Sequence, residues 1–229
     1  MITITTENEK EIFDAGYPCI VPFLMTETDG NVEFEIYEGI TDLVNDFISR
    51  FEGEYFCDRA LTWLDGKIRP YLEKNGFYRE KYGILRWYHQ FTLAPGDAVN
   101  TALILPETVK ISEKIPSKTL MKASEMLDGG SEVFGVIEYG AVVSLAAVNE
   151  NESGGCSEIT VETSPSCRKR GFGASNTAAL AESLLESGET VAYCCSRYNR
   201  GSIRIARRVG FRETGRFYAI DAYPIENRP

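Results

Sequence analysis

The sequence contains a single histidine, His89, and none of its six cysteines belongs to a CxxC pair. Zinc sites in proteins are built mainly from closely spaced Cys and His ligands, so we predict no metal site. Cys194 and Cys195 are adjacent, and in a strand their side chains point to opposite faces, which disfavours a disulfide between them. We therefore expect all six thiols to be reduced and to serve as small core residues.

Long apolar runs are also lacking. No stretch approaches the roughly 18–20 apolar residues that cross a bilayer. The first residues, MITITTENEKEIF, show neither the basic region nor the apolar region of a secretory signal. We therefore expect a cytoplasmic protein without a membrane partner.

Positive charge is scarce overall but concentrated in one segment. The chain has a formal net charge of -10, yet residues 165–216 contain ten Lys and Arg residues and only four Glu, which gives this segment +6 and leaves -16 for the remainder. A nucleic acid duplex would be repelled by most of such a surface, so nucleic acid is not an expected partner. The pattern favours an anion bound in the basic segment and a cationic ligand elsewhere.

The first part of the chain has a mixed pattern. Hydrophobic periodicity predicts a helix over roughly 40–51 and a second over 61–72 that ends at Asn75-Gly76. A strand rich in aromatic residues is predicted from Tyr82. Because regularity breaks at 95–115, we predict two domains: an N-terminal α/β lobe of unknown role, residues 1–100, and a second domain, residues 101–229.

The second part shows clearer elements. Residues 133–148 read as a β-hairpin that turns at Tyr139-Gly140, and a turn at 149–156 leads to a third strand. The remaining elements are a helix after Gly171 with an alanine stripe, a strand over 190–196, a helix that Ser202 can N-cap, and a strand over 216–223. The order β-β-β-α-β-α-β predicts an α+β, layered fold with a mixed sheet.

The stretch SPSCRKRGFGASNTAAL places three consecutive cations, Arg168 to Arg170, on a glycine-rich turn before a predicted helix. A helix N-terminus offers unpaired N–H groups and a positive dipole end, and glycine lets the backbone approach an anion closely. No GxxxxGK[ST] string is present, so a P-loop is excluded. The GxGxxG fingerprint of dinucleotide sites fails because its sixth position is Asn176.

What remains is Arg-x-x-Gly-x-Gly-Ala at 168–174, which resembles the acyl-CoA pyrophosphate loop of the GNAT N-acetyltransferase superfamily. The context agrees, because an apolar strand that ends at Pro165 precedes the turn, and a helix and a strand follow it. The string N-x-x-S-x-x-x-A-x-x-x-G-F, from Asn199 to Phe211, looks like the next motif of the superfamily. The resemblance covers roughly 110–223 and implies a mixed, splayed sheet flanked by helices, with acetyl-CoA as the co-substrate.

The resemblance also implies which residues hold acetyl-CoA. The strand before the turn would offer unpaired backbone groups to the pantetheine arm, as an added strand would. Some of Arg197, Arg200, Arg204 and Arg207 would meet the adenosine phosphate, although a solvated helix face explains them equally well. The cofactor-binding residues expected are Val161, Glu162, Thr163, Arg168, Lys169, Arg170, Gly171, Phe172, Gly173, Ala174, Asn199 and Ser202.

Acetyl transfer to an amine requires a base for the amine and a proton for the departing thiolate. Glu158 and Glu162 share one face of the strand before the turn, and Glu158 is the better candidate base. Superfamily members often carry a tyrosine as the general acid seven residues after the asparagine, but Ala206 occupies that position. Tyr198, Tyr193, Ser196 or water could supply the proton instead. His89 lies outside the motif, and we expect it to be structural.

We therefore predict transfer of an acetyl group from acetyl-CoA to a primary amine of a small molecule, by direct attack, in a monomer or homodimer. Three alternatives stay open. The acceptor could be a protein or peptide N-terminus. Because of Ala206, the domain could instead be a non-catalytic acyl-CoA sensor. The turn could also belong to a nucleotide-binding module, in which case ATP or NAD would compete with coenzyme A.

Overall fold

The computed structural model describes residues 1–15, 17–79, 86–111, 132–148 and 155–227. The chain divides into two compact units, here called unit 1 (residues 1–88 and 215–229) and unit 2 (residues 89–214). The domain boundary expected at residue 100 lies inside unit 2, and the C-terminal segment belongs with unit 1. None of the helices in the described part of the chain is long and apolar enough to cross a membrane.

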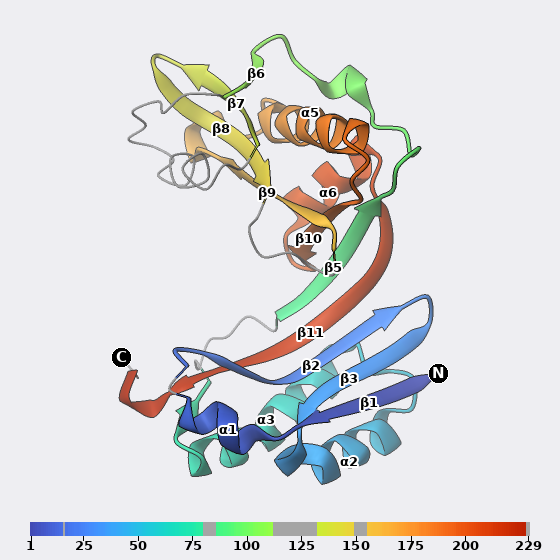
Figure 1. The fold of residues 1–229 in the computed structure, drawn as a ribbon, viewed down its shortest axis with the longest axis vertical. Coiled ribbons are helices and arrows are strands. Elements are labelled where there is room, and N and C mark those ends of the chain that lie inside the picture. Colours follow the sequence, from blue (N-terminus) through green and yellow to red (C-terminus); the bar gives the residue numbers. More distant parts are fainter. Residues whose placement is uncertain (16, 80–85, 112–131, 149–154, 228–229) are drawn as a thin grey trace. The chain divides into compact units, whose positions relative to one another are not determined.

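Unit 1 is a mixed sheet with helices on one face (Figure 1). Its strands lie in the order β1 (Ile2–Glu7), β3 (Asn31–Tyr37), β2 (Ile20–Thr28) and β11 (Arg212–Pro224), and β4 (Phe77–Tyr78) pairs with the end of β11. Only β1 and β3 are parallel among these pairs. The helices are α1 (Glu9–Asp14), α2 (Thr41–Phe51) and α3 (Asp58–Lys74), with a short 3-10 turn η1 (Glu38–Ile40) before α2.

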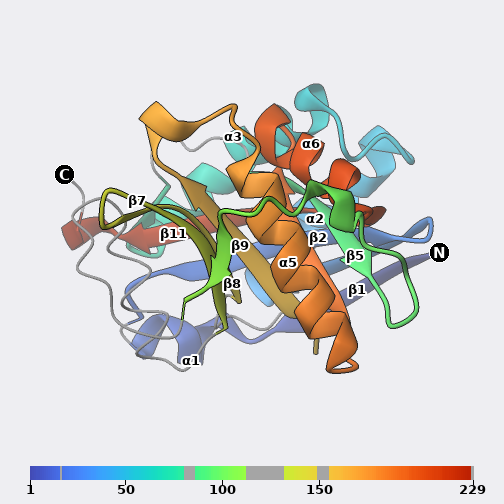
Figure 2. The same ribbon diagram turned by 90° about the horizontal axis from the view of Figure 1, so that it is seen from above.

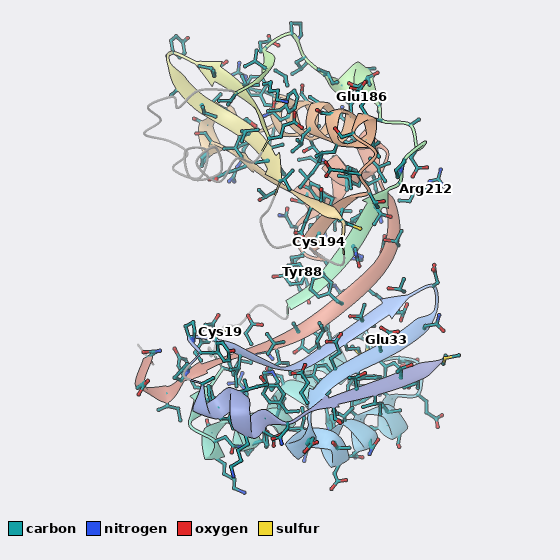
Figure 3. The ribbon with its side chains drawn as sticks, viewed as in Figure 1. Cys19, Glu33, Tyr88, Glu186, Cys194 and Arg212 are labelled. Atoms are coloured by element: carbon teal, nitrogen blue, oxygen red, sulfur yellow. The ribbon has the colours of Figure 1, made fainter. Side chains whose placement is uncertain are left out.

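Alternation along β3 explains which face of this sheet is covered. Val32, Phe34 and Ile36 are buried, whereas the residues between them are exposed, as Figure 3 shows for Glu33. The buried side chains pack against aromatic residues of α2, with the Phe34 and Phe47 rings 6.3 Å apart. Unit 1 therefore has a hydrophobic core of its own, on the helical side of its sheet.

Unit 2 contains a second run of strands, in the order β5 (Arg86–Leu93), β10 (Val191–Ser196), β9 (Ser157–Thr163), β8 (Ala141–Val148), β7 (Val133–Glu138) and β6 (Thr108–Lys110). β7 and β8 form a hairpin whose turn residues, Tyr139 and Gly140, have φ of 53° and 74°. Positive φ at both positions matches the turn that best joins two twisted antiparallel strands. The predicted hairpin is thus confirmed.

Helix α5 (Phe172–Glu186) lies along β8 and β9 and also contacts α6 (Arg200–Val209) and the 3-10 turn η2 (Thr101–Leu103) (Figures 1 and 2). Its residues from Phe172 to Ala181 are all buried, including polar ones. Small side chains such as Ala174 and Ala178 let the helix approach several elements closely. The expected single alanine stripe was therefore too narrow a description, because this helix is enclosed on more than one side.

The other expectations largely agree with the structure. The helices at 40–51 and 61–72 correspond to α2 and α3, and the predicted α+β class with a mixed, splayed sheet is confirmed. Ser202 was the wrong N-cap: α6 begins at Arg200, and the Asn199 side chain accepts a hydrogen bond from the Ser202 N–H. The expected start of a strand at Tyr82 and most of the turn at 149–156 lie outside the described residues.

Candidate cofactor-binding site

Strands β9 and β10 are paired only at their beginnings. Their parallel register covers Ser157 with Val191 and Glu158 with Ala192, and both strands then continue without further pairing to each other. Over the same stretch β9 stays paired with β8. The far edge of β9 therefore keeps backbone N–H and C=O groups that β10 does not use.

Backbone alternation decides which residues offer those groups. The Ser164 N–H donates to the Val143 carbonyl on β8, and successive residues of a strand direct their backbone groups to opposite edges. The backbone of Glu162 thus faces β8, whereas those of Val161 and Thr163 face the open edge. Glu162 was expected to bind the cofactor, and only its side chain remains a candidate for that role. The Thr163 carbonyl accepts a hydrogen bond of 3.2 Å from Arg168 Nε.

The glycine turn ends at the N-terminus of α5. Lys169 has φ of 65° and Gly171 has φ of 93°, so the chain passes twice through the left-handed region before the helix starts. Gly171 is the N-cap and has no side chain to accept from the first N–H groups, and no acidic residue lies in the first turn. This helix start therefore has the unpaired donors and the dipole that favour a bound anion.

One cleft of about 740 Å³ joins the open edge of β9, the glycine turn and α6. Of the twelve residues predicted to bind the cofactor, eleven line it: Val161, Glu162, Thr163, Arg168, Lys169, Gly171, Phe172, Gly173, Ala174, Asn199 and Ser202. They come from three separate elements, so only the fold brings them together. Neither Glu158 nor Tyr198 is among the residues that line the cleft.

Arg170 is the predicted cofactor residue that lies elsewhere. Its guanidinium makes two hydrogen bonds to Glu138, of 2.8 and 2.6 Å, and lies 4.3 Å from the centre of the Phe172 ring. Hydrogen bonds from Arg170 hold the pKa of Glu138 below its ordinary value of 4.5. The Arg170 side chain thus ties the glycine turn to the β7–β8 hairpin, and only its backbone N–H remains a candidate ligand.

Four lining residues have no place among the cofactor residues inferred from the sequence: Cys167, Gly201, Ile205 and Arg208. Three of them lie on α6, where Gly201, Arg204, Ile205 and Arg208 recur at spacings of three and four residues. Such spacing places side chains on one face of a helix. Helical periodicity applied from Asn199 onward would therefore have identified this face. Cys167 carries no comparable signal.

The cleft is basic. Arg168, Lys169, Arg204 and Arg208 line it, and Glu162 is the only acidic side chain among the described lining residues. A second, shallower pocket of about 480 Å³ lies against the same helix and is lined by Ile203 and by Arg200, Arg204, Arg207 and Arg208. Arg207 is partly neutralised by Glu213, at 3.3 Å. The surplus of positive charge suits a ligand with several phosphate groups.

Glu158 lies at the point where β9 and β10 still pair. It hydrogen-bonds the thiol of Cys194, the residue that Figure 3 labels on β10. Burial, reinforced by this carboxylate, raises the pKa of Cys194 to about 12. Burial and the nearby Glu213 raise the pKa of Cys195 to about 11. Both thiols are thus protonated at neutral pH, which makes either a poor nucleophile.

The tyrosine candidates differ in their surroundings. Tyr193 is almost fully buried, and this burial raises the pKa of its hydroxyl to about 12 against the opposing effect of a hydrogen bond from Ser202. Tyr198 is 51% exposed, with the Arg197 guanidinium 5.1 Å from its ring centre. Ala206 is fully buried in the core of unit 2. Ala206 is not among the residues that line the cleft.

His89 and the cysteines fit structural roles. His89 Nδ1 lies 2.6 Å from Glu213 Oε1, away from the lining of the cleft, and all six cysteines are free thiols. Among the residues that the structure describes, no group of three or more His, Cys, Asp or Glu side chains is placed to hold a metal ion.

Part of the chain is similar to a known protein family. Residues 133–219 match a family model described as FR47-like protein. The match begins at β7 and ends within β11, so it contains the open edge of β9, the glycine turn and α6. No curated protein matches the chain.

One solved structure shows the same fold. A protein of Novosphingobium aromaticivorans assigned to the GNAT family of acetyltransferases is 18% identical over 65% of this chain and 68% of its own, with a TM-score of 0.52. A GCN5-related N-acetyltransferase from Sphaerobacter thermophilus is 11% identical over 85% and 72%, with a TM-score of 0.47. The likeness to the Novosphingobium protein shows a shared fold.

Proposed function

We propose that the chain is an acetyl-CoA-dependent N-acetyltransferase of the GNAT superfamily that acts on a primary amine of a small molecule, since residues 133–219 match the FR47-like model and the fold is shared with a GNAT-family acetyltransferase. The observation that carries the proposal is the single cleft in which the unpaired edge of β9 meets the uncapped N-terminus of α5. An extended arm ending in a pyrophosphate matches both features at once.

The residues present fit acetyl-CoA part by part. The backbone groups of Val161 and Thr163 would bind the pantetheine amides, and the N–H groups from Gly171 to Ala174 would bind the pyrophosphate. Arg204 and Arg208 would meet the adenosine phosphate. When bound, acetyl-CoA supplies the thioester that the amine attacks. Its several negative charges would neutralise the cationic lining of the cleft.

Direct attack by the amine is the proposed mechanism. The two thiols of β10 do not favour a covalent route through themselves, since burial raises the pKa of Cys194 and of Cys195 and a covalent route needs a thiolate. Glu158, positioned by the Cys194 thiol, is the proposed base that accepts the proton of the attacking amine. Tyr198 is the proposed donor to the leaving thiolate, because the Tyr193 hydroxyl has a pKa of about 12 and is a weak acid.

The acceptor is proposed to be a small cationic amine, since the chain outside the basic segment carries an excess of acidic residues. We further propose that the protein acts in the cytoplasm, as a monomer or homodimer, where six free thiols would stay reduced. Neither nucleic acid nor membrane is a proposed partner.

Calorimetric titration with acetyl-CoA, with ATP and NAD as controls, tests the proposal directly. Micromolar affinity for acetyl-CoA with weak binding of both nucleotides is the expected result. A panel of amines with thiol release as the readout then tests turnover. Equal or tighter binding of ATP or NAD would instead assign the cleft to a nucleotide.

A substitution in the turn locates the binding site. A Cβ atom on Gly173 would lie 3.2 Å from Ile205 and 3.3 Å from the Thr163 hydroxyl, so a side chain there requires these neighbours to shift by a few tenths of an ångström. Gly173→Glu adds bulk and negative charge there, and we expect it to abolish acetyl-CoA binding. Unchanged circular dichroism is the control for folding. Retained affinity would show that the turn is not the anion site.

A second candidate function, acyl-CoA sensing without catalysis, is favoured by one observation. Ala206, at the position where superfamily members often have their general acid, is fully buried. A sensor would bind acetyl-CoA with micromolar affinity but release no thiol with any amine of the panel. Tyr198→Phe separates the two functions further, because it lowers turnover only in an enzyme that uses this hydroxyl.

A further inference from the structure

A chain of buried polar groups runs beneath the cleft. Ser175 and Asn176 on α5 and Ser144 on β8 are each fully buried, although all three are polar. Buried polar groups are rarely tolerated without hydrogen-bond partners, and here every one of them has at least two. None of the three lines the cleft.

The contacts form one continuous series. The Leu105 N–H donates to Ser175 Oγ at 2.7 Å, Ser175 Oγ lies 2.6 Å from Thr108 Oγ1, and Thr108 Oγ1 donates to Asn176 Oδ1 at 3.1 Å. Asn176 Nδ2 then donates to Ser144 Oγ at 3.0 Å, and Ser144 Oγ donates to the Glu162 carbonyl at 3.2 Å. The series therefore starts in the loop after η2 and ends on the backbone of β9.

Donor and acceptor counting fixes the direction of the series. A backbone N–H can only donate and a carbonyl can only accept, so both ends are determined. Because Thr108 gives its one hydroxyl proton to Asn176, the proton between Ser175 and Thr108 belongs to Ser175. Ser144 likewise gives its proton to Glu162, so the Thr163 hydroxyl, 2.8 Å away, donates to Ser144. The bonds from Leu105 to the Glu162 carbonyl thus all point the same way, an arrangement in which each bond polarises the next, and the bond from Thr163 joins them at Ser144 as a side branch.

The series connects the two parts of the proposed acetyl-CoA site. Asn176 lies one turn into the helix whose N-terminus would hold the pyrophosphate. Ser144 accepts hydrogen bonds from Asn176 and from the Thr163 hydroxyl and donates to the Glu162 carbonyl, so it is bonded to the strand that would bind the pantetheine arm. α5 and β9 approach closely at this point, since a Cβ on Gly173 would lie 3.3 Å from Thr163 Oγ1.

We propose that Ser144, Asn176 and Thr108 are positioning residues that set the distance and angle between the open edge of β9 and the N-terminus of α5. This inference rests on the proposed function. The cofactor must engage both anchors at once, so its affinity depends on how well the spacing of the anchors matches the ligand. A ligand that engages one anchor alone does not depend on that spacing.

The test compares whole and half ligands on the full chain. Ser144→Ala removes the hydroxyl at the centre of the series, and we expect it to weaken acetyl-CoA binding about tenfold. S-acetylpantetheine, which uses the β9 edge, and 3′-phosphoadenosine 5′-diphosphate, which uses the turn, should each change by less than about twofold. The binding constants are measured by calorimetry or by competition.

Thr108→Val interrupts the series at a second point and replaces Ser144→Ala in the same binding measurements if Ser144→Ala folds poorly. Thr108→Ser, which keeps the hydroxyl, should restore the affinity for acetyl-CoA. Thr177→Val is the matched control: Thr177 is fully buried on the same helix, but its hydroxyl bonds only within α5, to the Gly173 carbonyl at 2.8 Å. We expect Thr177→Val to leave unchanged the ratio between the affinity for acetyl-CoA and the affinity for each half ligand.

The outcomes distinguish the positioning role from the proposed function. If the parent protein fails to bind acetyl-CoA, the proposed function falls and this inference falls with it. If the parent binds and Ser144→Ala binds equally well, only the positioning role is overturned. The positioning role would also be overturned if Ser144→Ala weakened binding of the half ligands as much as binding of acetyl-CoA, because the series would then only support the local fold.

Discussion

Among single residues, two glycines in helical surroundings show opposite consequences of lacking a side chain. Gly171 has φ of 93°, a conformation that other L-amino acids reach only at a cost, and its turn leads the chain into α5. Gly66 lies inside α3 without positive φ, and a Cβ there would meet no atom within 4 Å. Only Gly171 is therefore needed for its backbone geometry.

Gly171→Ala should therefore destabilise the folded protein by about 1–2 kcal/mol, which is the cost of a left-handed alanine. Gly66→Ala should stabilise it by about 0.5–1 kcal/mol, since alanine is the better residue in a helix interior. Equilibrium unfolding in urea measures both changes. Shifts of the same sign in the two variants would contradict this interpretation.

The ion pair between Glu138 and Arg170 predicts a pH-dependent stability. Arg170 holds the pKa of Glu138 below 4.5 in the folded protein, so the pair contributes stability above this pH and the contribution is lost as the pH falls through the folded-state pKa. Glu138→Gln should be less stable than the parent at neutral pH. The difference should shrink as the pH falls below 4.5, as followed by thermal unfolding. A difference that persists in acid would point to packing rather than charge.

At the scale of elements, α6 shows how one residue can be both a helix cap and part of the lining of the candidate site. Asn199 accepts a hydrogen bond of 3.1 Å from the Ser202 N–H, and it also lines the cleft. The helix carries an apolar face toward the core of unit 2, with Ala206 and Val209 buried, and an arginine-rich face toward solvent and ligand. The residue at which α6 begins therefore determines which of its side chains line the cleft.

Substitution of Asn199 should separate the two roles. Asn199→Ala removes the cap and should cost about 1 kcal/mol of stability. Asn199→Asp keeps an acceptor for the Ser202 N–H and should retain stability, but its negative charge should weaken binding of acetyl-CoA. Urea unfolding and calorimetric titration provide the two measurements. Equal affinity in the parent and the aspartate variant would exclude position 199 from the anion site.

For the whole molecule, the path of the chain matters more than any single element. β11 begins at Arg212, and from Gly215 onward its residues belong to unit 1, where they pair with β2. Tyr218, Ile220 and Ala222 are fully buried there. The Tyr218 hydroxyl also accepts a hydrogen bond from Arg79, whose guanidinium is paired with Asp65 of α3. Unit 1 is therefore completed by the last residues of the sequence.

A chain that ends at Thr214 should leave unit 1 unfolded, because β2 loses its antiparallel partner and Arg79 loses a buried partner. Hydrogen exchange in α2 and α3 is the measurement, and loss of protection there is the expected result. A chain that ends at Pro224 keeps all of β11 and is the control. Native protection of α2 and α3 without residues 215–229 would show that unit 1 folds independently of them.

The sequence by itself determined the local elements and led to the prediction of an anionic ligand. Periodicity predicted α2 and α3, turn chemistry predicted the hairpin at Tyr139-Gly140, and the string from Arg168 to Ala174 indicated an anion at a helix start. These features depend on neighbouring residues, so a linear pattern contains them. The fold class followed from their order.

The tertiary structure alone decided which distant residues meet. Burial of Ser175 and Asn176 follows from elements that enclose α5, so no local pattern contains it. The same holds for Arg170, which pairs with Glu138 32 positions away instead of facing the cleft. It holds also for the C-terminal strand that completes unit 1. Contacts between residues far apart in sequence depend on the packing of the whole chain, and that packing set the spacing of the candidate site.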